Sequence, residues 1–144
     1  MEYKKMGDSI YIRMDRDDEM IDCILNVCKN EGVKSATYMG IGGCKDATLQ
    51  TFIPEKGEFE SEKIEGMLEL VSFIGNVISD DAGELYHHTH AMYAFVKDGK
   101  HEVMGGHLKA STVLYTAEIE LRPVAGDGIG REPNPETGTG FWKF

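Results

Sequence analysis

The sequence predicts an α+β domain with a mostly antiparallel sheet and one helix near its N-terminus. Three observations lead to this class. Residues 20–28 repeat apolar side chains at helical spacing. Segments that alternate apolar and polar residues occupy most of the chain outside that helix. Asp98-Gly99, a dipeptide typical of two-residue hairpin turns, separates two of these segments. One helix with six to eight short strands indicates an antiparallel sheet covered on one side.

The N-terminal part of the chain predicts a strand followed by the helix. Residues 9–13, Ser-Ile-Tyr-Ile-Arg, alternate between apolar and polar. Asp15 or Asp17 can cap the helix that follows, because a short carboxylate accepts from its free backbone N–H groups. Gly32 is expected to end the helix.

The middle of the chain predicts several strands interrupted by glycine and proline. Glycines at positions 40, 42 and 43 are expected to break the first of them, and Pro54 to stop the second. The longest of these strands is expected to bend at Gly75. The predicted strands are residues 34–41, 47–53, 59–64 and 68–78.

A hairpin and a final strand are predicted before an irregular tail. Residues 86–97 and 101–109 flank the Asp98-Gly99 turn, and residues 111–121 form the last strand. The tail, residues 123–144, is rich in glycine and proline and is expected to be irregular. It ends in Phe-Trp-Lys-Phe, which would pack either against its own domain or against a neighbouring subunit.

Length and composition indicate one globular domain, residues 1–144, expected in the cytoplasm. No apolar run is long enough to cross a membrane, and no secretory signal is evident. Cys23, Cys28 and Cys44 are too few and odd in number for a disulfide framework. The formal net charge of −10 disfavours nucleic-acid binding, which depends on Lys and Arg neutralising phosphates.

The hairpin brings three histidines together. If Asp98 and Gly99 are the turn residues, paired residue numbers keep a constant sum of 197, so His90 lies opposite His107. Directly opposed side chains share a face of the sheet. His88 lies two residues from His90 and shares that face as well. Three imidazoles from two adjacent strands are therefore predicted to converge.

Three converging imidazoles are typical of a transition-metal site, with zinc as the default ion. Such a site leaves a coordination position for water or a ligand. The alternative is that the histidines are ordinary surface or hydrogen-bonded residues. A bulge at Gly105-Gly106 would break the register, although two glycines would also let the backbone approach a metal or ligand closely. His87 and His101 are interpreted as ordinary polar residues.

Several motifs, taken together, resemble the PPC (plants and prokaryotes conserved) family. The resemblance covers about residues 8–122 and is most specific at His88-Thr89-His90 and Gly105-Gly106-His107-Leu108. The other motifs are Tyr-Met-Gly-Ile-Gly-Gly at 38–43, Leu-Glu-Leu-Val-Ser-Phe-Ile-Gly-Asn-Val at 68–77, Asp98-Gly99 and Thr-Ala-Glu-Ile at 116–119.

The resemblance implies a mostly antiparallel α/β domain assembled as a homotrimer, with metal bound by the three histidines in some prokaryotic members. The family is labelled as DNA-binding, and its plant members carry an Arg-Gly-Arg AT-hook that enters the minor groove. The only Gly-Arg pair in this chain is Gly130-Arg131, followed by Glu132-Pro133. The charge and the missing hook therefore disfavour direct DNA binding.

Two functions remain open from the sequence. The first is a metal-containing binding or regulatory trimer that recognises a protein or a small molecule. The second is a metal-dependent enzyme in which an open zinc position activates water. Cys44 could be a fourth ligand or a nucleophile, and Glu118 a nearby carboxylate, but a buried thiol and a solvated carboxylate are the simpler interpretations.

Overall fold

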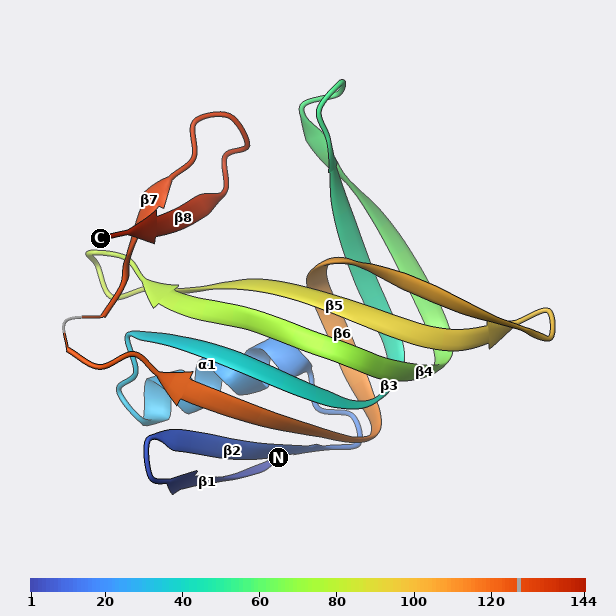
Figure 1. Ribbon diagram of the computed structural model, residues 1–144, viewed down its shortest axis with the longest axis horizontal. Coiled ribbons are helices and arrows are strands. Elements are labelled where there is room, and N and C mark those ends of the chain that lie inside the picture. Colours follow the sequence, from blue (N-terminus) through green and yellow to red (C-terminus); the bar gives the residue numbers. More distant parts are fainter. Residues whose placement is uncertain (127) are drawn as a thin grey trace.

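The computed structural model describes residues 1–126 and 128–144. In this part of the chain one helix lies against one face of a large sheet, and a small hairpin stands apart at the C-terminus (Figure 1). The elements are β1 (Glu2–Met6), β2 (Ser9–Asp15), α1 (Met20–Asn30), β3 (Ser35–Ile53), β4 (Glu58–Ser79), β5 (Leu85–Lys97), β6 (Lys100–Pro123), β7 (Gly130–Pro133) and β8 (Gly140–Lys143). The prediction of a mostly antiparallel sheet with one helix is confirmed.

The large sheet has six strands in the order β1-β2-β6-β3-β4-β5, and all its pairings are antiparallel. The first half of β6 pairs with β5, and its second half pairs with β2. On its other edge, β6 pairs with β3 from His107 to Pro123. Because β5 pairs with both β4 and β6, the sheet closes on itself through β6.

The strands are longer than predicted, because three expected breaks are absorbed within continuous strands. Residues 35–41 and 47–53 belong to β3, which shifts register between Gly40 and Gly42 and again between Cys44 and Asp46. A Cβ on Gly42 would lie 2.6 Å from the carbonyl oxygen of Thr116. The glycine therefore permits close approach to β6 and does not end the strand. Residues 59–64 and 68–78 likewise form β4, and residues 101–109 and 111–121 form β6.

Both ends of the chain differ from the prediction. The polar N-terminal residues form β1, which pairs with β2 although its sequence lacks an apolar pattern. The tail predicted as irregular contains the β7–β8 hairpin. This hairpin turns back toward its own domain, where the Arg131 guanidinium lies 4.2 Å from the Tyr86 ring centroid. Phe144 is 98% exposed and therefore does not pack against its own domain.

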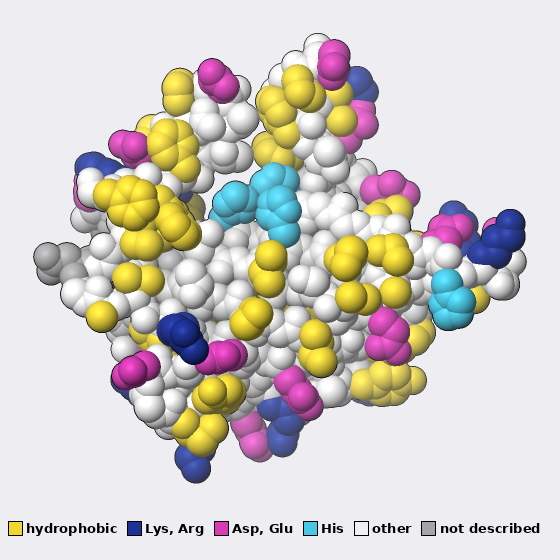
Figure 2. All heavy atoms as spheres, viewed as in Figure 1, with side chains coloured by type: hydrophobic (Ala, Val, Ile, Leu, Met, Phe, Trp, Pro, Cys, Tyr) yellow, Lys and Arg dark blue, Asp and Glu magenta, His cyan; other side chains and the backbone are white. Residues whose placement is uncertain are grey.

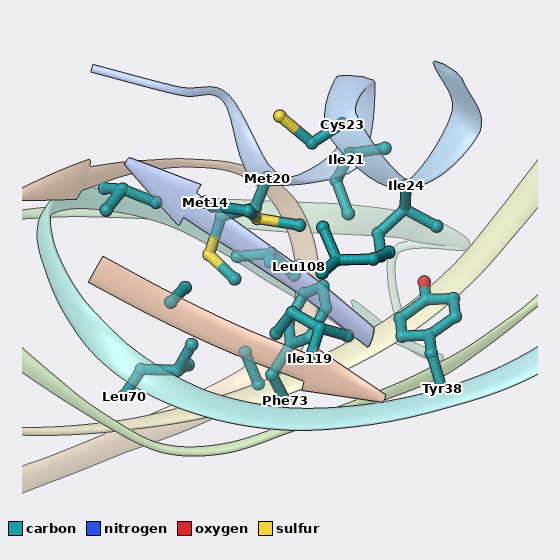
Figure 3. Close-up of a cluster of buried hydrophobic side chains, with 14 of the residues drawn as sticks. Met14, Met20, Ile21, Cys23, Ile24, Tyr38, Leu70, Phe73, Leu108 and Ile119 are labelled. Atoms are coloured by element: carbon teal, nitrogen blue, oxygen red, sulfur yellow. The ribbon is translucent and has the colours of Figure 1, made fainter. Parts of the chain in front are cut away.

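The core lies between α1 and the sheet (Figure 3). The predicted helical stripe is buried, with Met20, Ile24 and Val27 fully inaccessible. The helix cap differs from the prediction: the Glu19 carboxylate accepts from the Asp22 backbone N–H, whereas Asp17 adopts a left-handed conformation in the preceding turn. None of the helices in the described residues has the length and apolar character to cross a membrane.

The three cysteines are buried and free, in agreement with the absence of a disulfide framework. Burial raises the pKa of the Cys23 thiol to about 11 and that of Cys28 to about 12. Both thiols are therefore protonated at neutral pH and behave as small apolar side chains.

Candidate metal centre

The β5–β6 hairpin has the register that the turn predicts. Asp98 and Gly99 both have positive φ, of 50° and 75°, as a two-residue turn between twisted strands requires. Lys97 pairs with Lys100, and the same register continues without a bulge to His90 opposite His107. The prediction of this pairing is confirmed.

The two glycines before His107 serve close packing and do not shift the register. Gly105 and Gly106 remain paired with Met92 and Ala91. A Cβ on Gly106 would lie 2.8 Å from the Gln50 carbonyl oxygen on β3. The absence of a side chain there lets β3 approach β6 closely at the point where Gln50 pairs with His107.

The structure brings His88, His90 and His107 together. One ligand nitrogen from each can be chosen so that all three lie within 4.8 Å of one another. The ring centroids are 4.2 Å apart for His90 and His107, 5.0 Å for His88 and His107, and 5.3 Å for His88 and His90. His88 and His90 are exposed, and His107 is half-buried. The three imidazoles therefore form a triangle open to solvent.

The electrostatic environment favours neutral imidazoles. Partial burial and, to a smaller extent, the neighbouring His90 lower the pKa of His88. Partial burial is also the main cause that lowers the pKa of His107, and His90 and His88 lower it further. A neutral imidazole has a free nitrogen lone pair, which is the form that binds a metal. At neutral pH these two side chains therefore stand ready as ligands.

The remaining predicted residues lie outside this triangle. Cys44 is fully buried in the core, with its Sγ 3.6 Å from the Met20 sulfur, and Glu118 is an exposed residue of β6 opposite Arg13. His87 places its Nδ1 2.9 Å from the Thr89 hydroxyl. Within the described chain no cysteine or carboxylate joins the three histidines.

Residues that the sequence interpretation missed surround the triangle. The Phe59 ring meets His107 edge-on, with centroids 5.2 Å apart. Asn76 pairs with His88 across β4 and β5, and its side-chain oxygen is buried without a partner in the described residues. Trp142 and Arg131 reach the site from the C-terminal hairpin and line cavities that His88 also lines. The aromatic ending of the chain was the only sequence signal for this arrangement.

The histidines lie at the bottom of a notch between two projecting parts of the molecule (Figure 2). One wall is the outer part of the β3–β4 ribbon, which carries Phe59, and the other is the β7–β8 hairpin. One cavity beside the histidines is lined from both projections, by Phe59 on one side and by Arg131, Thr139 and Gly140 on the other.

Comparison with known proteins identifies the family and its fold. Residues 1–124 match the Plants and Prokaryotes Conserved domain, abbreviated PCC or PPC. A plant- and prokaryote-conserved protein from Pyrococcus horikoshii is 32% identical in sequence, with a TM-score of 0.83 over 99% of this chain and 95% of that chain. None of the curated proteins matches the chain.

Two further solved structures share the fold. A metal-containing protein from Archaeoglobus fulgidus is 26% identical, with a TM-score of 0.83 over 100% of this chain and 99% of that chain. A candidate DNA-binding protein from Bacteroides thetaiotaomicron is 24% identical, with a TM-score of 0.88 over 99% of this chain and 96% of that chain. At this lower identity the second likeness supports the fold alone.

Proposed function

The chain belongs to the Plants and Prokaryotes Conserved domain family, and on that premise we propose that it binds one divalent transition-metal ion per chain through His88, His90 and His107. The observation that carries this proposal is the convergence of three imidazole nitrogens within 4.8 Å. The metal-containing protein from Archaeoglobus fulgidus supports it independently.

The donor set fits a first-row metal and favours zinc. Zinc–nitrogen bonds are about 2.0–2.1 Å, so three nitrogens around one ion lie roughly 3–3.5 Å apart. Small rotations of the three imidazole side chains would bring their nitrogens from the observed separations to this spacing. Three protein ligands leave one position open for a ligand or water, whose pKa a bound zinc ion would lower. No carboxylate of the described chain lies among the histidines to act as a general base, and we therefore propose ligand binding as the function of the site.

Elemental analysis of protein purified without a metal-affinity tag tests the proposal. We expect close to one metal ion per chain, with zinc as the main element. A chain that contains no metal after purification, and takes up none from excess zinc followed by gel filtration, would contradict it.

We further propose that the chain assembles as a homotrimer through the sheet face that carries the histidines. Met39 pairs with Ile74, and Ile74 with His90, so these side chains share one face. Met39, Ile41 and Ile74 are 58%, 59% and 50% exposed. Contiguous exposed apolar side chains of this size are typical of protein–protein contacts.

Light scattering at micromolar concentration is expected to give three times the chain mass of 16.0 kDa. Ile41→Glu should shift the protein toward the monomer, because a carboxylate buried at an interface has no partner there. Val103→Glu is the matched control, since Val103 is 62% exposed near the β5–β6 turn. A wild-type mass of one chain would refute the trimer.

DNA binding by this chain is expected to be weak. DNA affinity depends on cations that neutralise phosphates, and this chain has 25 acidic and 15 basic residues. A mobility-shift titration at physiological salt should give no sequence-dependent complex below micromolar protein. Formation of such a complex would restore the DNA-binding function named for relatives such as the protein from Bacteroides thetaiotaomicron.

A further inference from the structure

A cavity of about 280 Å³ lies beside the histidine triangle, between the sheet and the C-terminal hairpin. His88 and His107 line it on the metal side, and Arg131, Thr139 and Gly140 line it from the hairpin. The volume is slightly below the usual range for drug-sized ligands, of about 300–1,000 Å³. It suits a small molecule.

Two cations line this cavity, Arg131 on β7 and Lys109 on β6. Within residues 1–126 and 128–144, neither forms an ion pair, and no aspartate or glutamate lines the cavity. In a chain with a net charge of −10, two unpaired cations beside one small cavity mark a place for an anion.

The rest of the lining is mixed. Gln50, His87 and Thr89 are polar, whereas Phe59 and Tyr86 bring aromatic rings, and the Arg131 guanidinium lies 4.2 Å from the Tyr86 ring centroid. Contact with the ring restricts the motion of the guanidinium, whose paired N–H groups match the two oxygens of a carboxylate. The cavity thus combines an anion-binding end with a body suited to a hydrocarbon or ring.

We propose that this cavity binds a small organic carboxylate, with its anionic group between Arg131 and Lys109 and its apolar part against Phe59 and Tyr86. The inference rests on the proposed metal site, because imidazole ligands bring no negative charge and the positive charge of the ion is left to attract an anion. Arg131 lies beyond the family match, which ends at residue 124. The three histidines lie within the matched residues, whereas Arg131 lies in the C-terminal hairpin beyond them. In this proposal the hairpin therefore supplies the preference for a carboxylate.

The test compares benzoate with benzamide, which has nearly the same shape but no charge. Each is titrated into isotopically labelled, zinc-loaded full-length protein, and the Kd is taken from amide chemical shifts. The zinc content of every sample is measured. We expect benzoate to bind about tenfold or more tightly than benzamide and to shift the amides of His107, Thr139 and Gly140.

Arg131→Gln and Lys109→Gln should each weaken benzoate binding by about tenfold and leave benzamide binding unchanged. Lys109 lies on β6, so its variant tests the anion site without disturbing the hairpin. Arg16→Gln is the matched control, because Arg16 also lies over an aromatic ring, that of Tyr115, but does not line the cavity. It should bind benzoate as the wild type does.

The two proposals fail in different ways. Protein without zinc contradicts the metal site only, because Arg131 and Lys109 remain and the benzoate preference can be measured on metal-free protein. Equal affinities for benzoate and benzamide overturn the carboxylate site even when zinc is stoichiometric. Equal affinities of wild type, Arg131→Gln and Lys109→Gln for benzoate overturn it as well.

Discussion

Replacing His90 by alanine is expected to abolish stoichiometric metal binding and the metal-dependent part of the free energy of unfolding. The His90 ring lies 4.2 Å from His107 and 5.3 Å from His88, so its loss leaves two ligands with no third donor nearby. Metal at 100 times its Kd stabilises a folded chain by about 2.7 kcal/mol. For a chain of this size, that corresponds to a difference of about 8 °C in Tm.

Metal content by elemental analysis and Tm by calorimetry, both at fixed protein concentration, measure this effect. His101→Ala is the matched control, because His101 is an exposed histidine near the β5–β6 turn, outside the triangle. The His101→Ala variant should have the same metal content and the same Tm as the wild type. A chelator should bring the wild type to the Tm of His90→Ala. Retention of one metal per chain by His90→Ala would place the metal elsewhere.

Phe73→Ala is expected to lower the free energy of unfolding by about 3–5 kcal/mol, a large part of the stability of a single domain. Phe73 is fully buried in the second half of β4, and its ring packs against Tyr38 with centroids 5.2 Å apart (Figure 3). Its removal leaves a cavity between the sheet and the rest of the core, where strands paired on both sides cannot easily collapse.

Urea denaturation in the presence of chelator separates this packing effect from metal binding. The midpoint should fall while the slope stays unchanged, because the surface exposed on unfolding is nearly the same. Val103→Ala, at a site 62% exposed, should change the free energy of unfolding by less than about 0.5 kcal/mol. Similar losses for the two variants would contradict the placement of Phe73 in the core.

The histidine triangle was predictable because it depends on local structure. A two-residue turn at Asp98-Gly99 determines the register of the strands that it joins. His90 and His107 are therefore paired once the turn is recognised, and His88 follows from the two-residue period of a strand. The helical stripe was predictable for the same reason, since its period needs only residues 20–28.

The continuity of the long strands was not predictable. Glycines at positions 40 and 42 resemble strand breaks in a single segment, because glycine is a common sign of a turn. Whether Gly42 ends a strand or lets two strands approach depends on Thr116 and Ala117 of β6, which lie more than 70 positions away in the chain. The polar β1 is likewise a strand only because β2 offers it a free edge.

The α+β class, the helix and the three converging histidines could be read from the residues alone, because each follows from spacing within one segment or across one tight turn. The surroundings of those histidines depend on the folded molecule. Phe59 and Arg131 reach the site from segments 48 residues before and 24 residues after His107. The positions of such distant segments depend on packing across the whole sheet, which no local period encodes.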